Sequence, residues 1–359
     1  MSNQLINSKP DFNRFLKAVT RSGVPDRVPF FEIFSQLHQQ TLDYIKEKDP
    51  QFEWICPPEK DCDERIYEFK RHISYMYALG YDYCTIIPEF EFYKTMHHSD
   101  ITKRDFLTTT DVMIKNRDDF KNYNWPEVAD TNVSLFENAG DYMPDGMKIV
   151  LYSRGPYLAT LYLLGYEGIC YLLADDEELV RDTLNATGER VLELYTKGAK
   201  FDNVGALAIG EDLAFYSGTY LPPKFLRKYV FPWYEKIVKV CHENNKPIIF
   251  HSCGNNEAVM EDLIACGFDA KHSFEDKIIP VWESKKKWGD RLTLMGGFDM
   301  HKLCEMNPEE IKAHTELLFE KCKPGGGWTF GSGNSIADYV PLENFITMIT
   351  EGHRLGSYI

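Results

Sequence analysis

The chain has 359 residues, of which 43% are hydrophobic, and this share is enough for a large core and excludes a disordered chain. The net charge of -15 at pH 7 argues against a nucleic-acid partner, because proteins that bind phosphate backbones carry a basic face. No segment contains a run of about 18 apolar residues, and the start lacks the pattern of a secretory signal, so we expect a cytoplasmic protein with no membrane partner.

Apolar segments alternate with helical segments along the chain. Residues 14–21 have helical spacing and predict an N-terminal helical extension before the first apolar segment. The apolar segments predict eight short buried strands, at 27–34, 81–88, 148–152, 204–209, 246–250, 269–273, 291–295 and 326–330. The intervening helical patterns cover 36–48, 63–79, 157–173, 177–200, 222–245, 257–266, 280–288, 308–323 and 341–353.

This alternation predicts an α/β protein with the architecture of a (β/α)8 TIM barrel. We expect a single domain over residues 1–359, with a long insert after the second strand at about residues 90–146. A doubly wound sheet is the alternative. The barrel is favoured because polar residues follow nearly all the strands, whereas an open sheet needs them only at its switch point.

The strand ends carry a set of ionisable and polar side chains that a barrel would bring to one mouth. They are Glu32, Glu89, Arg154, Glu211, Asp212, His251, Cys253, His272, Glu275, Asp299, Ser332 and Asn334. So many polar groups at interior-facing positions would be costly to bury without a ligand, a metal or one another. We therefore predict a functional mouth.

Within this set we assign roles by chemistry. The carboxylates are candidates for proton transfer, namely Glu211, Asp212, Glu275 and Asp299. Arg154 suits bidentate binding of a carboxylate or phosphate on a small-molecule substrate. Further substrate-binding candidates are Tyr216 and Tyr220, which follow the fourth strand, together with His272, Ser332 and Asn334.

His251 and Cys253 stand at the end of the fifth predicted strand, in the segment KPIIFHSCGNN. Imidazole and thiolate are good zinc ligands, and a catalytic zinc needs a third protein ligand, for which Glu211, His272, Glu275 and Asp299 are candidates. The alternative is a strand end before a glycine turn, with Cys253 as a small buried apolar residue. The nine cysteines form no Cys-x-x-Cys pair, which is typical of free thiols in a reducing compartment.

Several short motifs resemble one known family. They are Asp26-Arg27-Val28-Pro29, Gly210-Glu211-Asp212, His251-Ser252-Cys253-Gly254-Asn255, Trp288-Gly289-Asp290-Arg291 before Gly296-Gly297, and Gly333-Asn334-Ser335-Ile336 with Glu343-Asn344. On these the chain resembles the uroporphyrinogen decarboxylase superfamily, and more closely its zinc-dependent cobamide methyltransferases, which move methyl groups between a corrinoid and a thiol.

The resemblance implies that zinc is held by a His-x-Cys pair, here His251 and Cys253, and by a cysteine from the last strand. The residue that matches this cysteine is Asn334. An amide oxygen is a poor zinc ligand beside a thiolate, so a carboxylate such as Glu211 or Glu275 replaces it, or metal binds weakly, or no metal binds.

The resemblance implies a metal-assisted methyltransferase that acts on a methylcorrinoid carried by a partner protein. The first alternative is a metal-free decarboxylase-like lyase. Decarboxylases of the family have an Arg-rich motif where this chain has Phe30-Phe31-Glu32-Ile33-Phe34, and Glu32 is expected to repel a polycarboxylate. The second alternative is a non-catalytic barrel that binds a small ligand or a corrinoid protein, and a homodimer is left open.

Overall fold

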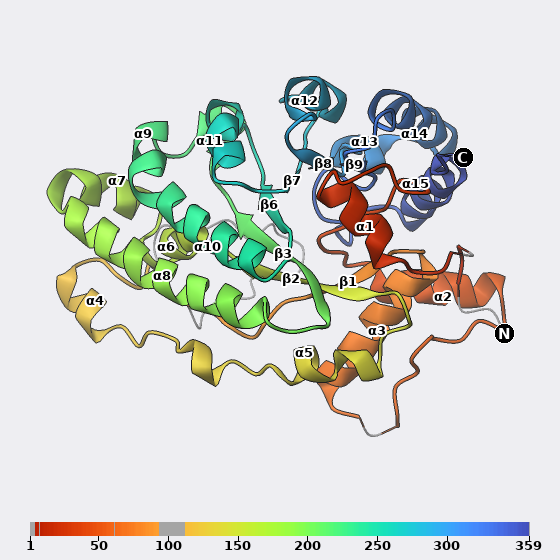
Figure 1. Cartoon of the computed structure of the whole chain (residues 1–359), viewed down its shortest axis with the longest axis horizontal. Helices are drawn as coiled ribbons and strands as arrows, with labels where there is room; N and C mark the ends of the chain where they lie inside the picture. Colours follow the sequence, from red (N-terminus) through yellow and green to blue (C-terminus); the bar gives the residue numbers. More distant parts are fainter. Residues whose placement is uncertain (1–3, 7, 61, 93–111, 359) are drawn as a thin grey trace.

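The computed structural model describes residues 4–6, 8–60, 62–92 and 112–358. Its centre is a curled sheet of seven strands in the order β1-β2-β3-β6-β7-β8-β9, which pair in parallel (Figure 1). The strands are β1 (Tyr83–Ile86), β2 (Lys148–Arg154), β3 (Val204–Glu211), β6 (Ile248–Ser252), β7 (Ala270–His272), β8 (Thr293–Met295) and β9 (Trp328–Thr329). Because this order follows the chain without a reversal, the fold is a TIM-barrel-like one, as predicted, and the doubly wound alternative is wrong.

The first barrel position departs from the prediction, because residues 27–34 form no regular strand. Phe30 makes an isolated parallel bridge to Phe330, where the Phe31 N–H donates to the Phe330 carbonyl at 2.7 Å. On the side of β1, the described residues form no backbone hydrogen bond to this segment. The Tyr83 hydroxyl instead accepts from the Glu32 N–H at 2.8 Å and donates to the Glu32 carbonyl at 2.7 Å. The hydroxyl of Tyr83 therefore links β1 to the first barrel segment in place of backbone hydrogen bonds.

Helices cover the outside of the sheet, with α8 and α10 on one side and α14 and α15 on another (Figure 1). The helices outside the insert are α1 (Phe12–Val19), α2 (His38–Lys48), α3 (Glu64–Ala78), α6 (Pro156–Leu164), α7 (Tyr166–Asp175), α8 (Glu177–Gly198), α9 (Pro223–Phe225), the π-helical turn η3 (Leu226–Val230), α10 (Phe231–Glu243), the 3-10 turn η4 (Glu257–Val259), α11 (Met260–Ala265), α12 (Val281–Trp288), α13 (Met300–Glu305), α14 (Pro308–Cys322) and α15 (Leu342–Leu355).

Two local features were not predicted, and one predicted helix is broken. Gly165, with φ +70°, divides the predicted helix at 157–173 into α6 and α7, which meet at 86°. A short hairpin of β4 (Ala214–Phe215) and β5 (Gly218–Thr219) follows β3, and α13 begins after the N-cap residue Asp299. No single helix in the described ranges is long and apolar enough to cross a membrane, and only the bent pair α6–α7 reaches the required length and composition together.

The predicted insert at about 90–146 is described only in part, because residues 93–111 lie outside the described residues. The remainder contains α4 (Arg117–Asn122), η1 (Val128–Asp130), α5 (Ser134–Asn138) and η2 (Ala139–Asp141), and it runs along α8 toward α3 (Figure 1). Arg117 forms an ion pair with Asp176 at 2.6 Å, at the start of α8. This part of the insert therefore packs on the helical layer.

Candidate functional site

The strand β6 carries His251 inside the sheet rather than after it, between Gly210 of β3 and His272 of β7. Its apolar residues are fully buried, and the strand then delivers Cys253 to the carboxyl-terminal end of the barrel. Gly254 follows with φ +73°, and a Cβ on it would lie 2.1 Å from the Ala214 carbonyl oxygen. Only glycine fits this turn, which holds Cys253 beside the β4–β5 hairpin.

A hydrogen-bonded chain fixes which nitrogen of His251 carries the proton. His272 Nε2 lies 3.3 Å from the Ser332 carbonyl, which only accepts, so this nitrogen bears a hydrogen. His272 Nδ1 therefore accepts from His251 Nδ1 at 2.8 Å, provided both rings are neutral. Burial lowers the pKa of His251 to about 3 and that of His272 well below its ordinary value, so both are neutral at pH 7. His251 Nε2 is left with a free lone pair.

That lone pair lies 3.8 Å from Cys253 Sγ. Asn334 donates from Nδ2 to the same sulfur at 3.1 Å, and the Ser273 hydroxyl lies 3.8 Å from it. Burial raises the pKa of the Cys253 thiol, the charge of Asp212 raises it further, and the hydrogen bonds from Ser273 and Asn334 oppose this. Asn334 thus contacts the sulfur by a hydrogen bond at the position where the resemblance implies a cysteine.

Lys271 supports this site and was not among the predicted residues. Its buried Nζ donates to the carbonyls of Ser252, His272 and Ser273, the last at 2.6 Å. Ser273 has φ 85°, a left-handed backbone that a residue with a side chain rarely adopts, and the ammonium holds it there. Burial lowers the pKa of Lys271 to about 8, against the charges of Cys253 and Glu275. The available sequence signal was a lysine in the middle of a strand that the alternating pattern predicts to be buried.

Glu32 joins the same network from the first barrel position. Its Oε1 accepts from the Ser332 N–H at 2.6 Å, and its Oε2 contacts the Ser332 hydroxyl, which donates to the Asn334 carbonyl at 2.6 Å. Burial raises the pKa of Glu32 to about 8, so it is protonated at pH 7 and donates to that hydroxyl. Because Glu32 is buried and neutral, the expected repulsion of a polycarboxylate by this residue does not arise.

The carboxyl group of Glu211 is hydrogen-bonded to the backbone at the start of α6. Its two oxygens accept from the backbone N–H groups of Tyr157 at 3.1 Å and Leu158 at 2.6 Å, at the start of α6. Burial raises its pKa to about 8. A Cβ at residue 155 would lie 2.0 Å from Glu211 Oε1, so Gly155 is what allows this approach.

Asp212 and Glu275 flank the sulfur electrostatically, since the charges of both raise the pKa of Cys253. Burial raises the pKa of Asp212 to about 6, and the Tyr220 hydroxyl lies 3.5 Å from its Oδ2. Glu275 accepts from the Gly254 N–H at 3.4 Å. These two carboxylates are thus the ones that the structure brings to the Cys253 side of the mouth.

The other predicted residues lie at the edge of this cluster or serve the backbone. Asp299 caps α13 by accepting from His301 and Lys302, and also accepts from the Asp276 N–H at 2.9 Å. Arg154 lies 3.6 Å from Glu91 and over the Tyr162 ring. Tyr216 is 64% exposed and donates to the Lys277 carbonyl.

The arrangement fits part of a zinc site. Zinc bond lengths of about 2.3 Å to sulfur and about 2.0 Å to nitrogen place two tetrahedral ligands about 3.5 Å apart, close to the 3.8 Å between Cys253 Sγ and His251 Nε2. Within the described ranges, however, no three His, Cys, Asp or Glu side chains are grouped to hold a metal. The chain therefore provides a donor pair, with no third ligand in place among these residues.

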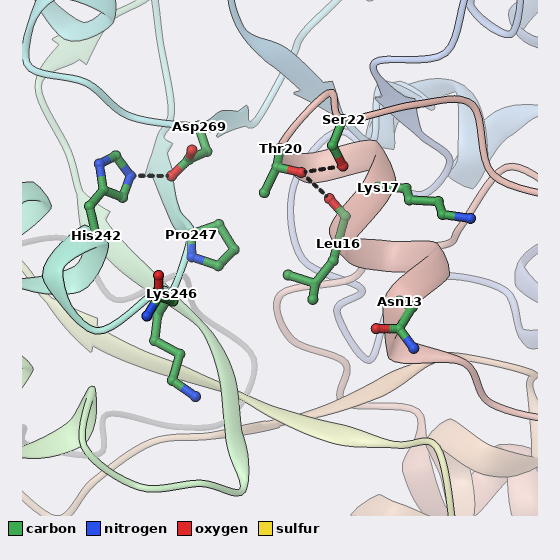
Figure 2. Close-up of a pocket in the computed structure, with 10 residues that line it drawn as sticks. Asn13, Leu16, Lys17, Thr20, Ser22, His242, Lys246, Pro247 and Asp269 are labelled. Atoms are coloured by element: carbon green, nitrogen blue, oxygen red, sulfur yellow. Dashed lines mark hydrogen bonds and ion pairs between the residues drawn. The ribbon is translucent and has the colours of Figure 1, made fainter.

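A cavity of about 820 Å³ lies at the opposite end of the barrel, between α1 and the start of β6. Figure 2 shows Lys17 and Lys246 extending away from its centre, while His242 pairs with Asp269 at 2.8 Å. Asp269 also accepts from the Ile248 N–H at 2.8 Å, which ties this pair to the strand. The amino-terminal end of such barrels serves stability, and none of the predicted site residues lines this cavity.

The fold and the strand-end cluster define a TIM-barrel-like protein with a polar mouth at the carboxyl-terminal ends of its strands. The family model for uroporphyrinogen decarboxylase (URO-D) matches residues 101–355. The chain belongs to the uroporphyrinogen decarboxylase family, and this confirms the resemblance seen in its motifs.

Two similar proteins are methyltransferases by name. The methylcobamide:CoM methyltransferase MtaA of Methanosarcina barkeri is 27% identical over 213 residues, which cover 57% of this chain and 61% of that protein. Its counterpart from strain Fusaro is 24% identical over 225 residues, which cover 62% of each. The chain thus spans about three fifths of the length of the curated relatives it matches.

A solved methyltransferase from Methanosarcina mazei superimposes with a TM-score of 0.69 at 15% identity, over 96% of this chain and 99% of that one. This likeness supports the fold assigned above.

Proposed function

We propose that the protein transfers a methyl group between a methylated corrinoid carried by a partner protein and a small thiol bound at the barrel mouth. The observation that carries this proposal is the pair His251 Nε2 and Cys253 Sγ, 3.8 Å apart, with the imidazole lone pair fixed toward the sulfur. The similarity to methylcobamide:CoM methyltransferases supports it.

His251 and Cys253 would hold zinc, whose chemistry is to lower the pKa of a thiol bound to it. The chain's own residues prepare this pair. His272 and the Ser332 carbonyl keep His251 in the tautomer that offers Nε2, and Asn334 orients the Cys253 sulfur through a hydrogen bond. Asp212, whose pKa burial raises to about 6 and whose charge acts on Cys253, would accept the proton that the acceptor thiol loses.

Methyl transfer to a thiol forms a carbon–sulfur bond while the methyl–cobalt bond breaks and its electron pair stays on cobalt. The direct test mixes purified protein with methylcobalamin and coenzyme M, and follows the loss of the methyl–cobalt absorbance and the methylated thiol by mass spectrometry. We expect turnover that Cys253→Ser lowers by roughly 100-fold. Cys170→Ser removes an exposed cysteine and is the matched control, with turnover unchanged.

The alternative reaction is the loss of carbon dioxide from a porphyrinogen. It is tested because the family that the chain matches is named after uroporphyrinogen decarboxylase. Carbon dioxide release from uroporphyrinogen, without methylcobalamin turnover, would replace the proposed function with a lyase. Binding of methylcobalamin without any chemistry, after a panel of thiols has been tried, would support a non-catalytic barrel.

A further inference from the structure

A second cavity, of about 500 Å³, lies beside the first two barrel positions at the carboxyl-terminal end. Its walls come from residues 33–35, from α2 and α3, from the end of β1 and from the described part of the insert. Apolar side chains make up much of the lining, including Phe34, Phe69, Ile87 and Leu135. None of the residues of the His251–Cys253 site lines it, so it is a separate compartment.

His38 and His72 line this cavity and are hydrogen-bonded to each other, which leaves the N–H of His38 as a donor. The Thr85 N–H donates to His72 Nε2 at 3.2 Å, so the hydrogen of neutral His72 is on Nδ1. His72 Nδ1 then donates to His38 Nε2 at 3.1 Å, and the hydrogen of neutral His38 is therefore on its Nδ1. Burial lowers the pKa of His38 to about 2 and that of His72 to about 4, so both are neutral at pH 7.

His38 Nδ1 has no acceptor among the described residues, although its ring lines the cavity and packs edge-on against Tyr75 at 4.5 Å between ring centres. The backbone of Thr85 thus fixes, through two rings, a hydrogen-bond donor at a largely apolar cavity. Few, well-placed polar groups in an apolar pocket are what orients a small ligand.

The charges at this cavity select against anions. Its carboxylates are Glu64, Glu68 and Glu89, and its guanidinium is that of Arg65. Arg65 is already paired with Glu89 at 3.0 Å and lies 3.5 Å from Asp63. Arg71, whose charge acts on both histidines, is likewise paired with Glu68. An incoming carboxylate or phosphate would meet an excess of negative charge with its cationic partner engaged.

We propose that this cavity binds a neutral, largely apolar small molecule that presents an acceptor oxygen to His38 Nδ1. A cavity of this size is within the range of small-molecule sites, and the apolar walls supply most of the binding through surface removed from water. The site uses none of the residues of the proposed methyl transfer and stands independently of it.

Three matched probes test the proposal by isothermal titration calorimetry. Acetophenone carries the acceptor oxygen, ethylbenzene has the same ring without it, and benzoate has the ring with a negative charge. We expect saturable binding of one acetophenone per chain, roughly fivefold weaker binding of ethylbenzene because one hydrogen bond is lost, and no measurable binding of benzoate.

Variants identify the cavity. His38→Phe removes the Nδ1 donor and also the acceptor of His72 Nδ1, so the variant is first checked for native circular dichroism. In the folded variant, acetophenone is expected to bind as weakly as ethylbenzene, because the aromatic ring remains and the donor is gone. Ile87→Trp, at a residue 53% exposed, is expected to block both neutral probes without disturbing the core. His242→Phe removes the histidine of the opposite cavity in Figure 2 and is the control, with all affinities unchanged.

The proposal is overturned if folded wild-type protein shows no saturable acetophenone binding, or if benzoate binds as tightly as acetophenone. It is also overturned if Ile87→Trp leaves binding intact. Cys253→Ser is expected to bind acetophenone normally, so loss of methyl transfer and loss of this binding are separable results.

Discussion

The residue that most distinguishes this site is Asn334, because it touches Cys253 where the resemblance implies a third zinc ligand. Its Nδ2 donates to the sulfur at 3.1 Å, and Ser335 contacts its Oδ1 at 3.4 Å. The distance of Asn334 from the sulfur shows that the last barrel position reaches the donor pair. A cysteine at position 334 would therefore reach the donor pair without a change of backbone.

Asn334→Cys is therefore expected to restore a three-ligand site and to raise zinc retention by at least roughly tenfold after dialysis against a competing chelator, because thiolate binds zinc far better than amide. Elemental analysis of the dialysed protein measures this. Ser335→Cys places a thiol one residue further along and is the control, with retention unchanged. Equal retention in Asn334→Cys and wild type would mean that the two positions do not share a metal.

Among the elements, the first barrel segment shows how a barrel position is held without a regular strand. The Tyr83 hydroxyl makes both hydrogen bonds to the backbone of Glu32, and the Phe31, Tyr83 and Phe15 rings pack together beneath it. The apolar run at 27–34 correctly indicated a buried segment. The link between this segment and β1 is made by the side chain of Tyr83, 51 residues further along the chain. The local sequence pattern therefore could not show that backbone hydrogen bonds to β1 are absent here.

Tyr83→Phe removes this hydroxyl and leaves one buried N–H and one buried carbonyl without a partner, so we expect a loss of about 2 kcal/mol in the free energy of unfolding. Urea denaturation followed by circular dichroism measures it. Tyr81→Phe is the control, because the Tyr81 hydroxyl is also buried but has no hydrogen-bond partner in the described part of the chain. Equal effects of the two substitutions would contradict the role of Tyr83 as the closing group.

At the scale of the whole molecule, buried carboxylates link stability to pH. Burial raises the pKa of both Glu32 and Glu211 to about 8, far above the ordinary value for glutamate. Between the ordinary pKa and about 8, the folded protein holds protons that the unfolded chain has released. Stability therefore falls as pH rises through this window, by at most about 1.4 kcal/mol per pH unit for each group.

Glu32→Gln carries a permanent amide hydrogen toward the Ser332 hydroxyl, as the protonated acid does, and it does not ionise. We expect the loss of unfolding free energy between about pH 6 and pH 8 to shrink by about 2 kcal/mol relative to wild type. Urea denaturation at several pH values measures the slope. The exposed Glu193→Gln is the control, and a slope in Glu32→Gln equal to that of wild type would contradict a proton on Glu32.

Much of the fold was predictable because the βα alternation is local, and the predicted strands other than the first appear in the sheet in chain order. The sequence also predicted that His251 and Cys253 lie together at a strand end, and their side chains are 3.8 Å apart, while their role stays a prediction. The tautomer chain through His272 and Ser332, the support by Lys271 and the commitment of Glu211 to α6 were not, because each depends on contacts across the barrel. The position of a residue at a strand end predicts that it faces the mouth. Only the folded structure shows whether its side chain is already hydrogen-bonded to the backbone, as that of Glu211 is.

The bonding of the first barrel segment also bears on how the protein is made. Residues 27–34 are synthesised well before their partners, because the Phe31 N–H bonds to Phe330 and Glu32 bonds to Ser332, 300 residues further along. During synthesis this apolar segment therefore emerges before the residues that it bonds to in the barrel. The barrel can therefore close only after residues 330–332 have been synthesised, and until then this apolar segment has none of these partners.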